Sequence, residues 1–324
     1  MANSGLPPLI PTIYRALEVI SRELVGFIPA VTMDASAARA AVNQDVTIPI
    51  APPGTAEDIT AAVAPPATGS QTFTNLTMKI TKSRAVPFLW NGEEVRGVEF
   101  GPSFDNLRRD QIVQAMRTLV NEVETDLAGL YAGASRATGT AGTAPFASTI
   151  GDSAQVRKIL ADNGAPMADL QLVIDTTAGA NLRTLPQLTK ANEAGDDAPL
   201  RRGVLLDING FAIRESAQVK LHTIGTGAGY LVNDATPPGV GETAITVDTG
   251  TGTIVAGDVM TGAGNATKYV VGTALAANVV TLNQPGLRHQ TVDNDALTVG
   301  AAYRANFAFH RGALVLLARA PALP

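Results

Sequence analysis

The 324-residue sequence contains no cysteine and only three histidines. Without cysteine, the chain has no disulfide framework, no cysteine-ligated zinc or iron–sulfur site and no thiol nucleophile. The histidines, His222, His289 and His310, do not stand at ligand spacing from one another. We therefore expect no metal, no cofactor and no catalytic group of these kinds.

Charged residues are also few. They make up 16 % of the chain, whereas an ordinary soluble domain has about 25 %. So little charge is typical of a surface that is glycosylated, secreted or covered by neighbouring molecules. The net charge of −5 excludes a basic protein that coats nucleic acid through counterion release. The hydrophobic fraction of 45 % predicts a folded chain with a sizeable core.

Long apolar runs are missing as well. No stretch of about 18 uncharged apolar residues occurs, so we expect no membrane contact. Prolines, arginines and glutamates interrupt the apolar segment at residues 6–25, whereas a secretory signal needs an uninterrupted apolar run. The prediction is a protein that stays in the cytoplasm, or is exported by a route that this segment does not show.

The first third of the sequence predicts a helix and a long hairpin. Apolar residues at steps of three and four predict a helix over residues 8–25, which either packs on its own domain or reaches a neighbouring subunit. Alternation predicts strands over residues 45–50 and 72–81. About twenty residues rich in Pro, Ala and Thr join them, and a loop of this length is either a site of interaction or a mobile surface loop.

A longer helix is predicted over residues 101–134, about 45 Å long at 1.5 Å per residue. Its charges oppose the helix dipole, because arginines come early and acidic residues, among them Glu124, come late. We therefore expect groups elsewhere to compensate these charges.

The middle of the chain predicts mixed α/β structure. Asp152 is the expected N-cap of a helix that Gly164 ends, and the Asn209-Gly210 pair predicts a hairpin turn. The other expected elements are a buried strand over 170–174, a helix over 177–185 and two strands within 203–216.

The composition changes near residue 224. The segment Ile224–Leu297 has no helical period and is rich in Gly, Thr and Val. Four short strands are predicted within it (244–247, 257–260, 268–273 and 279–282), which favours a small all-β barrel or sandwich. Six acidic and two basic residues give it −4 of the chain's −5. We expect an inserted module that folds independently, after which a strand over 303–310 closes the fold.

Two motifs suggest enzymes. Val247-Asp248-Thr249-Gly250-Thr251 matches the Asp-Thr-Gly loop of aspartic proteases, whose chemistry needs two carboxylates. Only one copy is present, so a symmetric dimer would have to supply the second; the alternative is a glycine turn between strands. Gly225, Gly227 and Gly229 form a G-x-G-x-G with no helix after it, which predicts a linker rather than a dinucleotide site.

The order of these parts resembles tailed-phage major capsid proteins of the Hong Kong ninety-seven type fold. It is most similar to coat proteins of short-tailed phages of the Salmonella podophage type, which carry an inserted β-barrel. Three strings carry the resemblance: Ala178–Arg183, Gly203–Ser216 and Ala305–Ala313. The resemblance implies an α+β fold with six parts. These are an N-terminal arm (1–43), an extended hairpin (44–82), a peripheral domain with a spine helix (83–135), an apical domain (136–222), the β module (223–298) and a return strand (299–324).

The resemblance also implies a function and partners. The chain would self-assemble as hexamers and pentamers into an icosahedral shell around double-stranded DNA, without enzymatic activity, in the host cytoplasm. A scaffolding protein, a portal protein and a decoration protein are the implied partners, and DNA is only a non-specific neighbour. The alternatives are a secreted or surface-layer β-rich protein and, more remotely, the dimeric protease.

We expect contacts between subunits from the arm helix and the hairpin loop. The expected contact residues are Ile13, Leu17, Ile20, Pro52, Pro53, Gly54, Ile59, Pro65 and Pro66. The hairpin from Gln44 to Met78 contains no lysine, so we expect a shell without lysine–asparagine cross-links.

Overall fold

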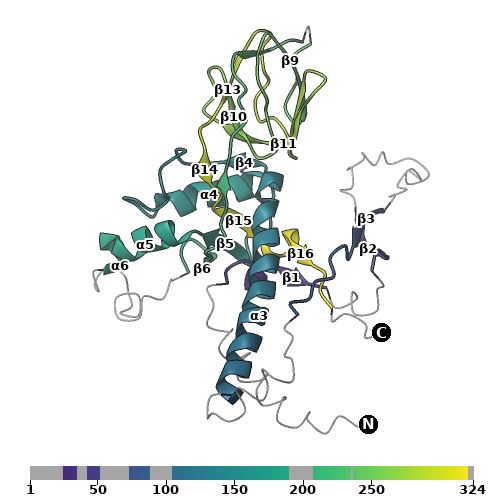
Figure 1. Cartoon of the computed structure of the whole chain (residues 1–324). Coiled ribbons are helices and arrows are strands. Elements are labelled where there is room, and N and C mark those ends of the chain that lie inside the picture. Colours follow the sequence, from purple (N-terminus) through teal and green to yellow (C-terminus); the bar gives the residue numbers. More distant parts are fainter. Residues whose placement is uncertain are drawn as a thin grey trace, which may run out of the picture. The chain divides into compact units, whose positions relative to one another are not determined.

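The computed structural model describes residues 25–34, 42–51, 73–87, 104–189, 207–234 and 236–319. It divides the chain into two units, of which the first comprises residues 1–31 and 86–314 and the second residues 32–85 and 315–324. The predicted arm helix and hairpin loop lie outside the described residues. Figure 1 labels most of the helices and strands described below.

The long helix of the first unit is α3 (Phe104–Ala128), which continues as the 3-10 turn η3 (Gly129–Gly133). Its end agrees with the prediction, and its predicted start at residue 101 lies outside the described residues. Ile112 and Leu127 of α3 are buried, whereas Leu130, which lies in η3 beyond the α-helix, is 46 % exposed.

A three-stranded sheet forms the core beside this helix. Its central strand β5 (Leu170–Ile174) pairs in parallel with β6 (Phe211–Glu215) and antiparallel with β15 (Phe307–His310). Every residue of β5 is buried, which explains its mostly apolar sequence, and the one polar residue, Gln171, accepts a hydrogen bond of 3.2 Å from Arg214 Nε. The same region contains three helices: α4 (Gly151–Asp162), which precedes β5 in the chain, and α5 (Thr176–Thr184) and α6 (Pro186–Thr189), which follow it.

Local capping is partly as predicted. Gly164 ends α4 with a φ of +74°, which favours glycine. Asp152 is not the N-cap, because Ile150 holds that position; the Asp152 carboxylate instead accepts a hydrogen bond of 2.7 Å from the Phe146 N–H. The N-cap of α5 is Asp175, which accepts from the Thr177 and Ala178 amides.

The hairpin turn at Asn209-Gly210 is confirmed, since both residues have positive φ (53° and 79°). The single strand predicted over residues 303–310 is wrong. It is two strands, β14 (Tyr303–Arg304) and β15, because β14 pairs with β7 (Leu221–His222) whereas β15 pairs with β5.

The predicted β module is a barrel. Six antiparallel strands follow one another in the order β10-β13-β8-β9-β12-β11, and pairing of β10 with β11 closes the ring. Their bounds are β8 Tyr230–Val232, β9 Ala244–Asp248, β10 Val259–Gly262, β11 Lys268–Ala276, β12 Val279–Leu282 and β13 Ala296–Val299. Inward-facing apolar residues such as Val232, Ile245 and Val280 fill it. The Asp-Thr-Gly string forms the turn after β9, where Thr249 has a φ of 54°.

One strand of this sheet lies outside the predicted boundaries. Strand β4 (Arg136–Ala137) pairs with β11 as a seventh strand next to the ring. The fragment 224–297 therefore lacks a pairing partner that the whole chain supplies.

The second unit contains two strand pairs. Strands β2 (Asp45–Ile50) and β3 (Thr74–Lys79) pair antiparallel, as the predicted hairpin requires, and β1 (Thr32–Met33) pairs in parallel with β16 (Val315–Leu316). Neither strand of the β2–β3 ribbon has a buried residue. The remaining short elements are the 3-10 turns η1 (Ile28–Ala30) and η4 (Arg311–Ala313), both in the first unit.

None of the helices within the described ranges is long and apolar enough to cross a membrane.

Candidate functional site

Four polar side chains gather where the barrel joins the rest of the first unit: Tyr131, His222, Asp258 and Tyr303. We call this cluster the joint. Tyr131 comes from η3 at the end of the long helix, and Asp258 from the turn before β10. His222 and Tyr303 lie opposite each other in β7 and β14, the two strands through which the chain enters and leaves the barrel region. The joint thus ties the long helix, both connecting strands and the barrel together.

A buried hydrogen-bond chain runs through the joint. His222 Nε2 lies 2.8 Å from Asp258 Oδ1, and His222 Nδ1 lies 2.7 Å from the Tyr131 hydroxyl. Because an ionised carboxylate only accepts, Nε2 of a neutral His222 donates to Asp258, and Nδ1 accepts from Tyr131. This tautomer satisfies both ring nitrogens.

The Asp258 carboxylate is fully buried and accepts further hydrogen bonds. The Val255 N–H donates to Oδ2 over 2.8 Å, and the Gly225 N–H lies 3.2 Å from both oxygens. A buried carboxylate is stable only when such donors replace water. Gly225 belongs to the G-x-G-x-G string, which the sequence predicts to be a linker into the β module. The Asp258 carboxylate holds this linker through its contact with the Gly225 amide.

Aromatic packing completes the joint. The ring centroids of His222 and Tyr303 are 5.1 Å apart, and Tyr131 meets His222 edge-on at 5.6 Å. The Tyr303 hydroxyl donates to the Gly257 carbonyl over 2.6 Å. A side chain at Gly257 would come within 3.0 Å of both His222 and Tyr131, and its φ of +94° also favours glycine.

A second attachment lies beside the joint. The Asn283 side chain at the end of β12 donates to the carbonyls of Ala132 and Ala134 over 2.6 and 2.8 Å. Arg136 of β4 donates to the Ile159 carbonyl of α4 and forms an ion pair with Asp162. The segment after the long helix therefore contacts the barrel on one side and α4 on the other.

The order Asp–His–Tyr resembles an acid–base relay, but its burial opposes a catalytic role. His222 is 3 % exposed and Asp258 is 0 % exposed, so a substrate cannot reach either group. The arrangement fits a rigid connection between the barrel and the helix.

We expect the joint to weaken at alkaline pH. Burial raises the pKa of Tyr303, with added contributions from Tyr131 and the Asp258 charge, and burial together with Asp258 raises the pKa of Tyr131. An unfolded tyrosine ionises near pH 10.0, whereas these two ionise only at higher pH in the folded chain. Stability is therefore fully present below pH 10 and falls above it. Urea unfolding between pH 8 and 11 should show a steeper decline in the wild type than in Y303F; equal slopes would contradict this explanation.

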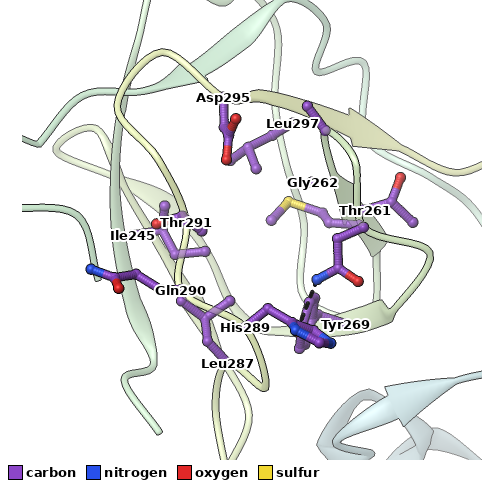
Figure 2. A pocket seen from close by; sticks show the side chains of 13 residues that line it. Ile245, Thr261, Gly262, Tyr269, Leu287, His289, Gln290, Thr291, Asp295 and Leu297 are labelled. Carbon is purple, nitrogen blue, oxygen red and sulfur yellow. Dashed lines mark hydrogen bonds between the residues drawn. The ribbon is translucent and has the colours of Figure 1, made fainter. Parts of the chain in front are cut away.

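A small cavity lies inside the barrel, between β10, β13 and the segment 287–291 (Figure 2). Its volume is about 30 Å³, and Tyr269, Thr291 and Asp295 are among the residues around it. A ligand pocket usually measures about 300–1,000 Å³, whereas a single water needs roughly 10–15 Å³. The cavity therefore has room for water but not for an organic ligand.

The residues predicted from the sequence and those of the joint do not overlap. All nine predicted contact residues, on the arm helix and the hairpin loop, lie outside the described residues. Within the ranges that the structure describes, no group of three His, Cys, Asp or Glu side chains could hold a metal ion. No local pattern in the sequence indicates the joint, because its consecutive members are 36 to 91 residues apart along the chain.

Comparison with solved structures finds similarities along most of the chain. One match, described as the capsid structure of the cyanophage P-SCSP1u, is 14 % identical, covers 89 % of this chain and 87 % of its own, and has a TM-score of 0.45. Another, described as the asymmetric unit of the bacteriophage PhiM1 mature capsid, is 13 % identical, covers 88 % and 86 %, and has a TM-score of 0.43. The chain is similar to phage capsid structures.

A third match, described as Mycobacterium phage Che8, is 15 % identical over 87 % of this chain and 91 % of its own, with a TM-score of 0.47. No protein-family model matches the chain, and no curated protein is detectably similar to it in sequence.

Proposed function

We propose that the chain is a major capsid protein that assembles into an icosahedral shell around a double-stranded DNA genome. The observation that carries this proposal is the order of its elements. An exposed two-stranded ribbon (β2–β3) precedes a long helix (α3), and a small sheet with helices follows. A closed barrel is then inserted before the last sheet strand, β15. This is the order that the resemblance implies.

The exposure of the ribbon supports assembly. Strands β2 and β3 bury no side chain within the chain, and Phe73, Ile50 and Leu76 are exposed apolar residues at or beside them. An isolated two-stranded ribbon is only marginally stable in water. Neighbouring subunits that cover it would stabilise it, and a shell also accounts for the low charge of the surface.

The partners follow from the same proposal. The chain forms hexamers and pentamers with itself, with the predicted arm and hairpin residues at the contacts. A scaffolding protein directs assembly in the host cytoplasm, a portal protein occupies one vertex, and a decoration protein binds the finished shell. The six parts predicted from the sequence are the proposed domains, and the chain performs no catalysis.

Electron microscopy tests the proposal. The chain, expressed together with the scaffolding protein from the same genome, should yield closed shells of uniform size. Flat arrays would instead support a surface-layer protein, and small discrete particles would support a protein that does not assemble. Either result would overturn the capsid role.

A further inference from the structure

A short segment near the start of the described chain, residues 25–31, is largely buried in the first unit, although Pro29 is exposed. Residues 25–31 lie against the long helix and the three-stranded sheet, and Phe27, Ala30 and Val31 are at most 1 % exposed. Since no helix or strand longer than the three-residue turn η1 forms here, the backbone N–H groups need other acceptors.

Glu124 of α3 supplies these acceptors. Its Oε1 accepts from the amides of Gly26 and Phe27 over 2.6 and 2.7 Å, and its Oε2 accepts from the Ile28 amide over 3.0 Å. Three successive N–H groups thus converge on one carboxylate, which is the arrangement of a backbone anion nest. Glu124 is itself only 1 % exposed.

Its place in the helix makes this carboxylate unusual. Glu124 lies near the C-terminal end of α3, where the helix dipole disfavours negative charge. Burial disfavours the charge as well. The three amides offset both effects, and they are the partners that the charge order of the sequence predicted.

Gly26 allows the segment to approach closely enough. A Cβ at this position would lie 2.8 Å from Val173 Cγ1 and 3.0 Å from both the Glu215 carbonyl oxygen and the Ser216 Cβ. The backbone therefore lies directly on strands β5 and β6, between the sheet and Glu124. A larger residue would push the amides away from the carboxylate.

We propose that Glu124 is the positioning residue that clamps residues 26–28 to the long helix and so sets where the preceding part of the chain joins the core. Both carboxylate oxygens of Glu124 accept hydrogen bonds from this segment. The clamp therefore needs a side chain that has two acceptor oxygens and the length of glutamate. It is independent of the capsid role, because it rests only on contacts within the first unit.

Hydrogen exchange on the full-length chain tests the clamp. In E124Q, one carboxylate oxygen becomes an NH₂ group that faces an N–H donor, so the peptide covering residues 25–31 should exchange at least tenfold faster. The peptide covering β5 should keep wild-type protection. D126N is the matched control, because it makes the same change at an exposed position of the same helix and should leave residues 25–31 protected.

E124D keeps the inference testable if E124Q fails to fold. It retains the charge but shortens the side chain by one methylene, so it should also release residues 26–28. Unchanged exchange at 25–31 in the folded variant would overturn the clamp. An equal loss of protection in β5 would also overturn it, because Glu124 would then support the whole fold rather than one segment.

Discussion

Replacing Asp258 with alanine should lower the free energy of unfolding by about 3–5 kcal/mol, because each buried donor left without an acceptor costs about 1–3 kcal/mol. The substitution leaves the Gly225 and Val255 amides and His222 Nε2 without their acceptor in a site closed to water. Urea unfolding monitored by tyrosine fluorescence and circular dichroism would measure the loss.

Two further variants distinguish the stability contribution of the joint from the general effect of removing a carboxylate. D293A makes the same change at an exposed position of the barrel and should cost less than about 0.5 kcal/mol. D258N keeps the shape of the side chain but removes its charge and one acceptor oxygen. Its loss of unfolding free energy should lie between those of D258A and D293A. If D258A and D293A were equally stable, the joint would contribute nothing to the connection of the barrel.

The strands could be predicted wherever the pattern that forms them is local. Strands β2, β5, β9 and β12 lie within one residue of the predicted bounds, because alternation or a mostly apolar run predicts each of them. The turn at Asn209-Gly210 was equally predictable, since positive φ at both residues favours these residue types.

Features that depend on distant partners were not predictable. The break between β14 and β15 arises because neighbouring residues pair with strands more than 40 positions apart in the sequence. Strand β4 is only two residues long and has no pattern of its own, yet it extends the sheet of the barrel. The joint combines two ordinary tyrosines, a histidine and an aspartate that come close to one another only after folding.

Glu124 lies between these two cases. Its misplaced charge was visible in the sequence and correctly indicated a compensating group, but backbone amides have no sequence signature. The residue types therefore showed that a partner was needed, and only the structure identified it as residues 26–28.

The largest effect on assembly is expected from the hairpin loop. Deleting residues 52–69 leaves Ala51, Ser70, Gln71, Thr72 and Phe73 between the paired residues Ile50 and Thr74. A five-residue connection is within the usual range for a β-hairpin, so the β2–β3 pairing and the first unit should persist. The deletion removes the six predicted contact residues of the loop. The protein should therefore remain soluble and folded but form no closed shells.

A second variant distinguishes loop length from loop chemistry. Replacing residues 52–69 with a Gly/Ser segment of equal length keeps the reach of the loop but removes its proline and apolar side chains. If these side chains hold neighbouring subunits, this variant should also fail to assemble, while its thermal unfolding matches the wild type. Sedimentation and electron microscopy of the particles would measure both outcomes. Normal shells from the deletion variant would exclude the loop from assembly, and normal shells from the Gly/Ser variant alone would show that its length, rather than its side chains, is what neighbouring subunits require.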